Sequence, residues 1–302
     1  MEKVKEQSIF ITYLATIAAI ILWGFSFVWT NEILIREIPI FTFLFVRLFL
    51  AGILLWIFSF VTKKLQKLNL KDFLLMCLMA FFEPFIYFIG ETYGMKATGS
   101  AVLTAVIIAT IPIVCMFVEK FIYKVPFTIY KIIGTALTIP GIALVVMNGK
   151  DNSVDHFYGI ALLFLAVAGA TGYAAVVKKL SGRYNAPTIA TYQFLIGSML
   201  FLPFFLLYGL DGVNKEFFSW DVQVPLLALA ILCSCVAFIF WVSSIKYLGM
   251  TKANIFSALI PAVSAIGAAM LGQEKINATI VLGIVVVILG VIIAQKNKKI
   301  KG

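Results

Sequence analysis

Long apolar runs, separated by short polar or turn-rich connectors, make up most of the chain. A helix that crosses a bilayer needs about 20 mostly apolar residues. Connectors such as "TKKLQKLNLKD" and "NGKDNSVDH" are too short to form a soluble domain. The pattern therefore predicts an all-α polytopic membrane protein with ten transmembrane helices. The predicted spans are residues 9–30, 40–61, 73–93, 98–118, 129–147, 157–177, 188–208, 224–245, 251–271 and 277–295.

The basic residues are distributed unevenly between alternate connectors. With the N-terminus in the cytoplasm, 18 of the 24 lysines and arginines fall on the cytoplasmic side, 5 fall outside, and Arg47 is left within a span. Cytoplasmic loops of membrane proteins carry the excess of positive charge. We therefore expect a multi-pass protein of the cell (plasma or inner) membrane with both termini cytoplasmic. The first apolar run extends to Trp29, which is too long for a signal-peptide core, so we expect it to be a retained span.

Composition supports the same class. The chain is 62% hydrophobic and 13% charged, whereas soluble domains are about half apolar and a quarter charged. The net charge of +10 comes from residues scattered over short connectors, so no nucleic-acid partner is expected. Cys233 and Cys235 would point to nearly opposite sides of a helix, and we predict no metal site and no cofactor. We expect His156 to be a solvated residue of a connector.

The two halves of the chain resemble each other. Gly24 and Gly172 are 148 residues apart, and so are Pro39 and Pro187. Three further pairs are each 149 apart: Pro112 and Pro261, Gly134 and Gly283, and Gly141 and Gly290. Because each half would hold five helices, the second copy would be inserted upside down. Inverted repeats recur in secondary transporters, whose binding sites lie near the midplane between the repeats.

Four segments resemble a known family: "ILWGFSFVWTN", "VRLFLAGILL", "TGSAVLTAVIIATIPIV" and "GQEKINATIVLGIVVVILGVIIA". Over essentially its whole length the chain resembles the EamA-type branch of the drug/metabolite transporter superfamily. The resemblance implies a ten-helix carrier of two EamA repeats, residues 1–150 and 151–302, and often an exporter of amino acids or other small metabolites. The family's Gly-Glu-Arg/Lys turn departs here by one residue that looks inserted, Gln273, and the first half reads "YKVPF" without the acid.

Glu83 and Pro84 interrupt the third predicted span. Glu83 lies about 15 Å into the membrane at 1.5 Å per residue, where an acidic residue costs about 2.5–3.5 kcal/mol. Pro84 is expected to kink the helix. Tyr87 and Glu91 follow at helical spacing, and Arg47 in the second span could meet either glutamate. Two interpretations stay open: a structural Glu–Arg pair, or a site for substrate or a proton. Both place Glu83 in the bundle interior.

Other residues add polar or aromatic edges to a possible pathway. Trp23 lies at mid-depth in the first span, where an interfacial tryptophan is not expected, and lining a pore and tight packing are both open for it. The second half offers further candidates in its second and third spans. The predicted substrate-binding residues are Trp23, Arg47, Glu83, Tyr87, Tyr192, Gln193, Trp241 and Ser244.

These patterns favour a secondary transporter that works by alternating access. The family resemblance implies a small metabolite, such as an amino acid or a drug-like compound, as its substrate, with export preferred. The chain has no GxxxxGK[ST] phosphate loop, so coupling would come from an ion gradient, with a proton as the candidate ion, or from the gradient of the substrate itself. The alternative is an integral-membrane enzyme of lipid modification, which would need clustered His, Asp or Glu residues. The acids here are scattered, so we expect no enzyme. The expected partners are a small-molecule substrate and the lipid bilayer, and the protein would be a monomer or a homodimer.

Overall fold

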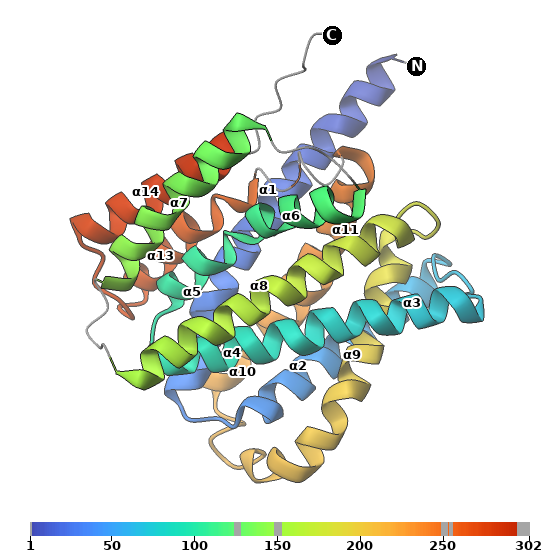
Figure 1. Ribbon diagram of the computed structural model, residues 1–302. Helices are drawn as coiled ribbons and strands as arrows, with labels where there is room; N and C mark the ends of the chain where they lie inside the picture. Colours follow the sequence, from blue (N-terminus) through green and yellow to red (C-terminus); the bar gives the residue numbers. More distant parts are fainter. Residues whose placement is uncertain (1, 124–127, 148–152, 249–252, 254–255, 295–302) are drawn as a thin grey trace.

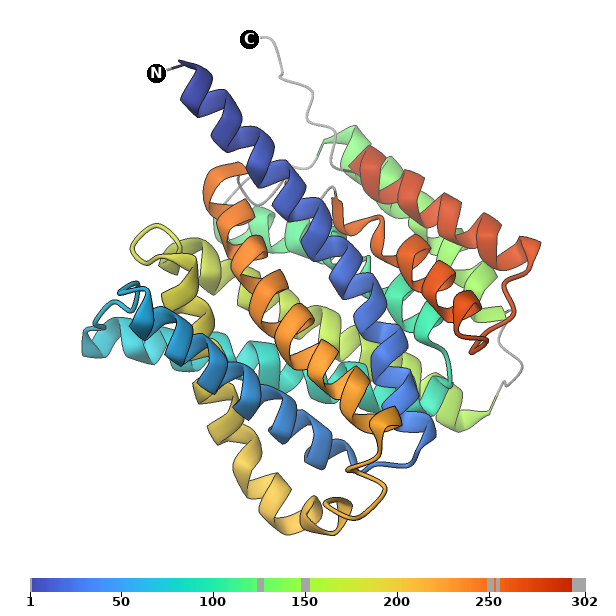
Figure 2. The same ribbon diagram turned by 180° about the vertical axis from the view of Figure 1, so that it is seen from behind.

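The computed structural model describes residues 2–123, 128–147, 153–248, 253 and 256–294, and in these it is a bundle of helices without strands (Figures 1 and 2). Its elements are α1 (Glu2–Ile35), α2 (Ile40–Val61), α3 (Leu70–Ala80), η1 (Phe81–Ile86), α4 (Tyr87–Thr98), α5 (Ala101–Ile108), α6 (Ile111–Tyr123), α7 (Ile129–Met147), α8 (Val154–Leu180), α9 (Ala186–Tyr208), η2 (Leu210–Gly212), α10 (Trp220–Leu227), η3 (Ala228–Val236), α11 (Ala237–Leu248), α13 (Ile260–Met270) and α14 (Ala278–Ala294).

The apolar helices match the predicted spans. Six segments are long and apolar enough to cross a membrane: Phe10–Ile35, Ile40–Val61, Leu70–Thr98, Val154–Leu180, Ala186–Tyr208 and Trp220–Leu248. Four shorter apolar helices accompany them: Ala101–Phe117, Ile132–Met147, Ile260–Met270 and Ala278–Ala294. Within the described residues, these segments fit the ten predicted spans, and they make the chain a multi-pass membrane protein.

Side-chain caps fix where several helices begin. Asn69, Ser100, Ser153 and Asn185 each accept a hydrogen bond from the backbone N–H three residues later. Such caps satisfy amide groups that have no partner inside the helix. The segment α4 ends at Thr98 and is capped by Gly99, whose φ of 63° suits glycine. Short polar connectors therefore set the helix boundaries as much as hydropathy does.

His156 corrects one prediction, because it is buried rather than solvated, with only 3% of its surface exposed. The cap at Ser153 starts α8 at Val154, three residues before the predicted start. His156 then lies on the same helix face as Gly159, one turn further on. Gly159 packs against Gly94 of α4, so this face of α8 points into the bundle.

The most extensive packing joins helices from the two halves of the chain. The segment α7 lies along α14, α4 along α8, and α2 along α9 (Figure 1). Glycines allow these close approaches. A Cβ at Gly134 would collide with the backbone of α14, and one at Gly90 would meet the carbonyl of Leu162 in α8 at 2.6 Å. Small residues bring transmembrane helices together in this way, so the core of the bundle is largely an interface between halves.

Four of the spans are irregular near their middle. The fourth predicted span is broken between α5 and α6, just before Pro112, and a turn precedes Pro261 in α13. Neither proline has an N–H to donate to the carbonyl four residues earlier. The third and eighth spans contain the π-helical segments η1 and η3. In η1, Glu83 has non-helical φ and ψ of −146° and 115°, and its peptide bond to Pro84 is cis. Pro84 thus disturbs its helix, as predicted.

Candidate functional site

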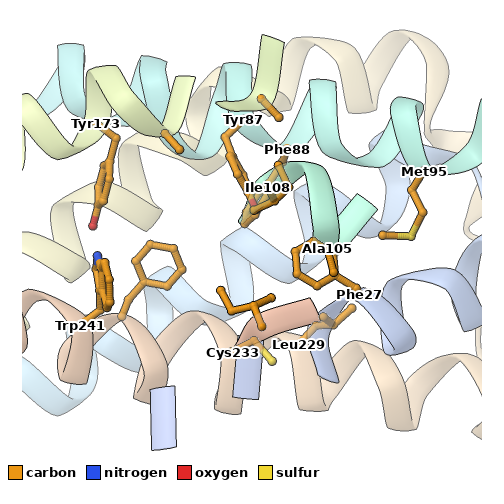
Figure 3. Close-up of a cluster of buried hydrophobic side chains, with 14 of the residues drawn as sticks. Phe27, Tyr87, Phe88, Met95, Ala105, Ile108, Tyr173, Leu229, Cys233 and Trp241 are labelled. Atoms are coloured by element: carbon orange, nitrogen blue, oxygen red, sulfur yellow. The ribbon is translucent and has the colours of Figure 1, made fainter. Parts of the chain in front are cut away.

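A cavity of about 80 Å³ lies inside the bundle where the irregular segments meet. One water needs about 10–15 Å³ by the same measure, so the cavity has room for several waters or a small solute. Helices from both halves form its wall, part of which Figure 3 shows. The lining residues are Trp23, Ser26, Phe27, Arg47, Glu83, Tyr87, Phe88, Glu91, Ile108, Ile111, Ala170, Tyr173, Ala174, Phe238, Trp241, Ser257 and Ile260.

Three side chains that normally carry charge face this cavity. Arg47 and Glu91 are each 2% exposed and Glu83 is 7% exposed. Arg47 Nε donates a hydrogen bond to Ser234 Oγ at 3.0 Å, and its guanidinium lies 4.4 Å from the centre of the Phe88 ring. Among the described residues, no carboxylate lies within 4 Å of Arg47 as an ion-pair partner. The arginine is therefore positioned by a hydroxyl and an aromatic face.

The two carboxylates lack protein partners as well. In the described part of the chain, neither Glu83 nor Glu91 accepts a side-chain hydrogen bond, and Glu91 Oε2 is completely buried without one. A buried charge is strongly disfavoured unless it is paired or neutralised. The site therefore requires partners that its own side chains do not supply, namely a proton, water or a bound ligand.

These contacts bear on the expectation that Arg47 could meet Glu83 or Glu91. All three residues reach one cavity, as expected from their depth, but they form no ion pair there. The physical reason is the position of Ser234 and Phe88, which hold the guanidinium. Of the two open interpretations of Glu83, the structural pair is therefore not what the described contacts support.

Aromatic side chains also line the cavity, next to its charged groups. The Trp23 ring lies 5.1 Å from the rings of Phe238 and Trp241, and Trp23 Nε1 donates to the Cys233 carbonyl at 3.2 Å. Tyr87 also lines the cavity. The structure therefore brings five of the predicted residues to one place: Trp23, Arg47, Glu83, Tyr87 and Trp241.

Three other predicted residues lie outside the cavity lining. Gln193 is fully buried and stands behind the wall, where its Nε2 donates to the Glu83 carbonyl at 3.2 Å. Ser244 Oγ lies 2.6 Å from Thr16 Oγ1 and ties α11 to α1. Tyr192 is half-buried against the apolar core. Gln193 thus supports the irregular backbone at Glu83. Ser244 and Tyr192 instead contribute to the packing between helices.

Sequence reasoning missed several lining residues, Tyr173 and Phe88 among them. Ile108 and Ser257 carried a usable signal, because each stands four residues before one of the paired prolines. A proline cannot complete the helical hydrogen bond to that position. Tyr173 had no such mark, since a tyrosine in a span is equally common in a packed core.

Polar contacts tie the helices together at the two ends of the bundle. Next to the Gly272 turn, Glu274 accepts hydrogen bonds from Ser100 Oγ at 2.9 Å and from the Val102 N–H at 3.0 Å. At the other end of the bundle, Asp72 accepts two hydrogen bonds. One comes from Arg183 Nη1 at 2.7 Å, and the other comes from the Tyr184 hydroxyl at 2.9 Å. Burial and the hydrogen bond with Asp72 raise the pKa of the Tyr184 hydroxyl. These contacts join connectors to spans that are far apart in the sequence.

The fold and the site define a class, a multi-pass membrane protein with a partly charged cavity enclosed by irregular helices. The EamA-like transporter family matches residues 10–147 and, a second time, residues 157–295. The chain belongs to this family, as its sequence resemblance implied, and it is a transporter in that general sense.

Individual relatives give the same result. The chain is 24% identical over 298 residues to the uncharacterized transporter YetK of Bacillus subtilis, an alignment that covers 95% of this chain and 87% of that one. It is 25% identical over 283 residues to an uncharacterized transporter of Archaeoglobus fulgidus, with 93% and 96% covered. A solved crystal structure has a similar fold, with a TM-score of 0.72 and 13% identity, over 94% of this chain and 97% of the other.

Proposed function

We propose that this protein is a secondary transporter that exports a small zwitterionic metabolite, such as an amino acid, by alternating access. The observation that carries the proposal is the cavity with Arg47, Glu83 and Glu91, all deeply buried and none paired with another. A zwitterion brings a carboxylate for the guanidinium and an ammonium group for a glutamate. It would thus supply the partners that the protein lacks.

The arrangement of the helices supports alternating access. In transporters with inverted repeats, discontinuous helices meet at a central site between the repeats. Here Ile108 and Ser257, next to the breaks before Pro112 and Pro261, both line the cavity. The pairing of α7 with α14 and of α2 with α9 is what a two-fold relation between residues 1–150 and 151–302 would produce. These features support two inverted repeats that rock around the cavity.

A proton is the proposed coupling ion. Two carboxylates and one guanidinium share the cavity, so one carboxylate remains after a zwitterion has satisfied the other two groups. That carboxylate needs a proton to stay neutral in a dry environment. Glu83 is our candidate, because its carboxylate lacks a partner and its own carbonyl is anchored by Gln193. Protonation and substrate binding would then be linked at one site.

Transport by the purified protein in proteoliposomes tests the proposal. Vesicles preloaded with a mixture of unlabelled amino acids should accumulate a labelled amino acid by exchange, saturably and without ATP. Arg47→Met should remove this exchange, because the carboxylate of the substrate loses its partner. Lys71→Met is the matched control, since Lys71 is an exposed cation on α3, and it should behave as wild type. Absence of exchange for every zwitterion, or normal exchange by Arg47→Met, would contradict the proposal.

A further inference from the structure

Besides its charged groups, the cavity contains neutral hydrogen-bonding groups without partners. The Tyr173 hydroxyl, on α8, is completely buried and has no hydrogen bond of good geometry. Gln193 lies close enough to interact with this hydroxyl, and Gln193 Oε1 is also buried without a partner. The Gln193 amide is oriented by its other end, because Nε2 donates to the Glu83 carbonyl. The Tyr173 hydroxyl thus lines the cavity without a partner, and the Gln193 amide stands behind it.

The indole of Trp241, on α11, faces the same place. Figure 3 shows its nitrogen and the Tyr173 hydroxyl oxygen pointing toward one another. Among the described residues, Trp241 Nε1 forms no hydrogen bond, whereas Trp23 Nε1 is used by the Cys233 carbonyl. Trp241 and Tyr173 are 7% and 3% exposed, and both line the cavity. Buried tyrosine and tryptophan side chains usually find partners for their polar atoms, so their shared lack of one marks a place for a ligand.

We infer that Tyr173 and Trp241, supported by Gln193, form a neutral subsite that binds a hydroxyl or carboxamide on the side chain of the substrate. The inference rests on the proposed transport of a zwitterion, and it narrows the substrate class. Trp241 Nε1 can only donate a hydrogen bond, while the Tyr173 hydroxyl can both donate and accept. A hydroxyl or a carboxamide is both donor and acceptor, so either group satisfies this set. A purely aliphatic side chain would leave both of these atoms unpaired.

Two pairs of amino acids of nearly equal shape test the subsite. Threonine has a hydroxyl where valine has a methyl group, and asparagine has a carboxamide where leucine has an isopropyl group. Affinities can be measured with the purified protein in lipid nanodiscs by quenching of tryptophan fluorescence, since Trp23 and Trp241 line the cavity. The polar member of each pair should bind about 10-fold more tightly, the effect of a site whose buried polar groups need partners.

Tyr173→Phe should reduce this preference to about 3-fold or less, by weakening threonine and asparagine while leaving valine and leucine unchanged. The variant breaks no hydrogen bond of good geometry, and its melting temperature should stay that of wild type. Trp241→Phe is an independent second variant with the same expected loss of preference, read out by competition with a labelled amino acid. Tyr192→Phe, at a half-buried tyrosine outside the cavity lining, is the matched control and should keep the full preference.

The outcomes separate the subsite from the transport proposal. Binding of all four amino acids with no preference for the polar members would overturn the subsite and leave the proposed function intact. A preference that persists in both Tyr173→Phe and Trp241→Phe would overturn the assignment of these residues. Binding of none of the four would overturn the proposed zwitterion substrate and the subsite with it.

Discussion

Replacing Glu83 with glutamine tests whether this carboxylate couples transport to protons. The amide has the shape of the protonated acid but cannot release a proton. Glu83 has no ion pair within 4 Å and no hydrogen bond to its carboxylate among the described residues. The substitution should therefore cost no more than about 1 kcal/mol, the scale of one ordinary hydrogen bond. The groups of the cavity that could respond to its charge are Arg47, Glu91, Tyr87 and Tyr173.

The assay compares two kinds of transport in proteoliposomes. Glu83→Gln should abolish accumulation driven by a pH gradient and preserve exchange between labelled and unlabelled substrate, which needs no net proton movement. Its melting temperature should shift by less than about 4 °C, given about 2–4 °C per kcal/mol for a chain of this size class.

Two results would refute this reasoning. A collapse of folded protein, with rescue by adding Arg47→Met, would mean that Glu83 holds Arg47 in a buried pair, whose loss costs about 3–5 kcal/mol. Normal gradient-driven accumulation in the variant would instead remove Glu83 from coupling. Measurement of protein yield before transport separates these two results.

Three further predictions concern topology and stability. A cysteine placed at Lys275 should react with a membrane-impermeant maleimide added to whole cells and one at Lys64 should not, and the reverse pattern would exclude cytoplasmic termini. Gly134→Ile should lower stability by about 1–3 kcal/mol because its side chain meets the backbone of α14; Ala136→Ile, at an exposed position of the same helix, should be neutral in the same thermal unfolding assay. Glu274→Gln should lower the melting temperature by the equivalent of about 1 kcal/mol, because Glu274 binds the amino end of α5 as an anion, and an unchanged value would show that this contact is not stabilising.

The spans could be predicted from the sequence because hydropathy acts over whole segments. The lipid environment requires every backbone group in a span to be bonded internally, which leaves a helix as the solution for each apolar run. The positions of Glu83 and Trp23 deep in the membrane could be predicted from the helical rise per residue alone. Their arrival at one cavity could be expected in outline, since a mid-bilayer acid has to face the bundle interior.

Side-chain partners could not be predicted in the same way. The contacts of Arg47 depend on how α2 is rotated about its axis and on Ser234, which is 187 residues away in the chain. The start of α8 at Val154 is fixed by a cap at Ser153, a local effect that hydropathy does not register, and His156 then lies on the helix face that packs against α4. The role proposed for Tyr173 depends on Gln193 and Trp241 from other helices, and its own surroundings in the sequence do not distinguish it from a packed tyrosine.

The charged residues of the cavity all come from the first half of the chain. Arg47, Glu83 and Glu91 all precede residue 148, whereas the lining residues after 153 contribute aromatic, hydroxyl and aliphatic groups. If the halves descend from one duplicated ancestor, the two copies have diverged to complementary chemistry. A symmetric dimer of the first half would present the arginine and both acids twice, and a dimer of the second half would present no charge from these positions. Neither could hold an asymmetric ligand in one fixed orientation, so divergence of the two copies would have been the step that made such a ligand recognisable.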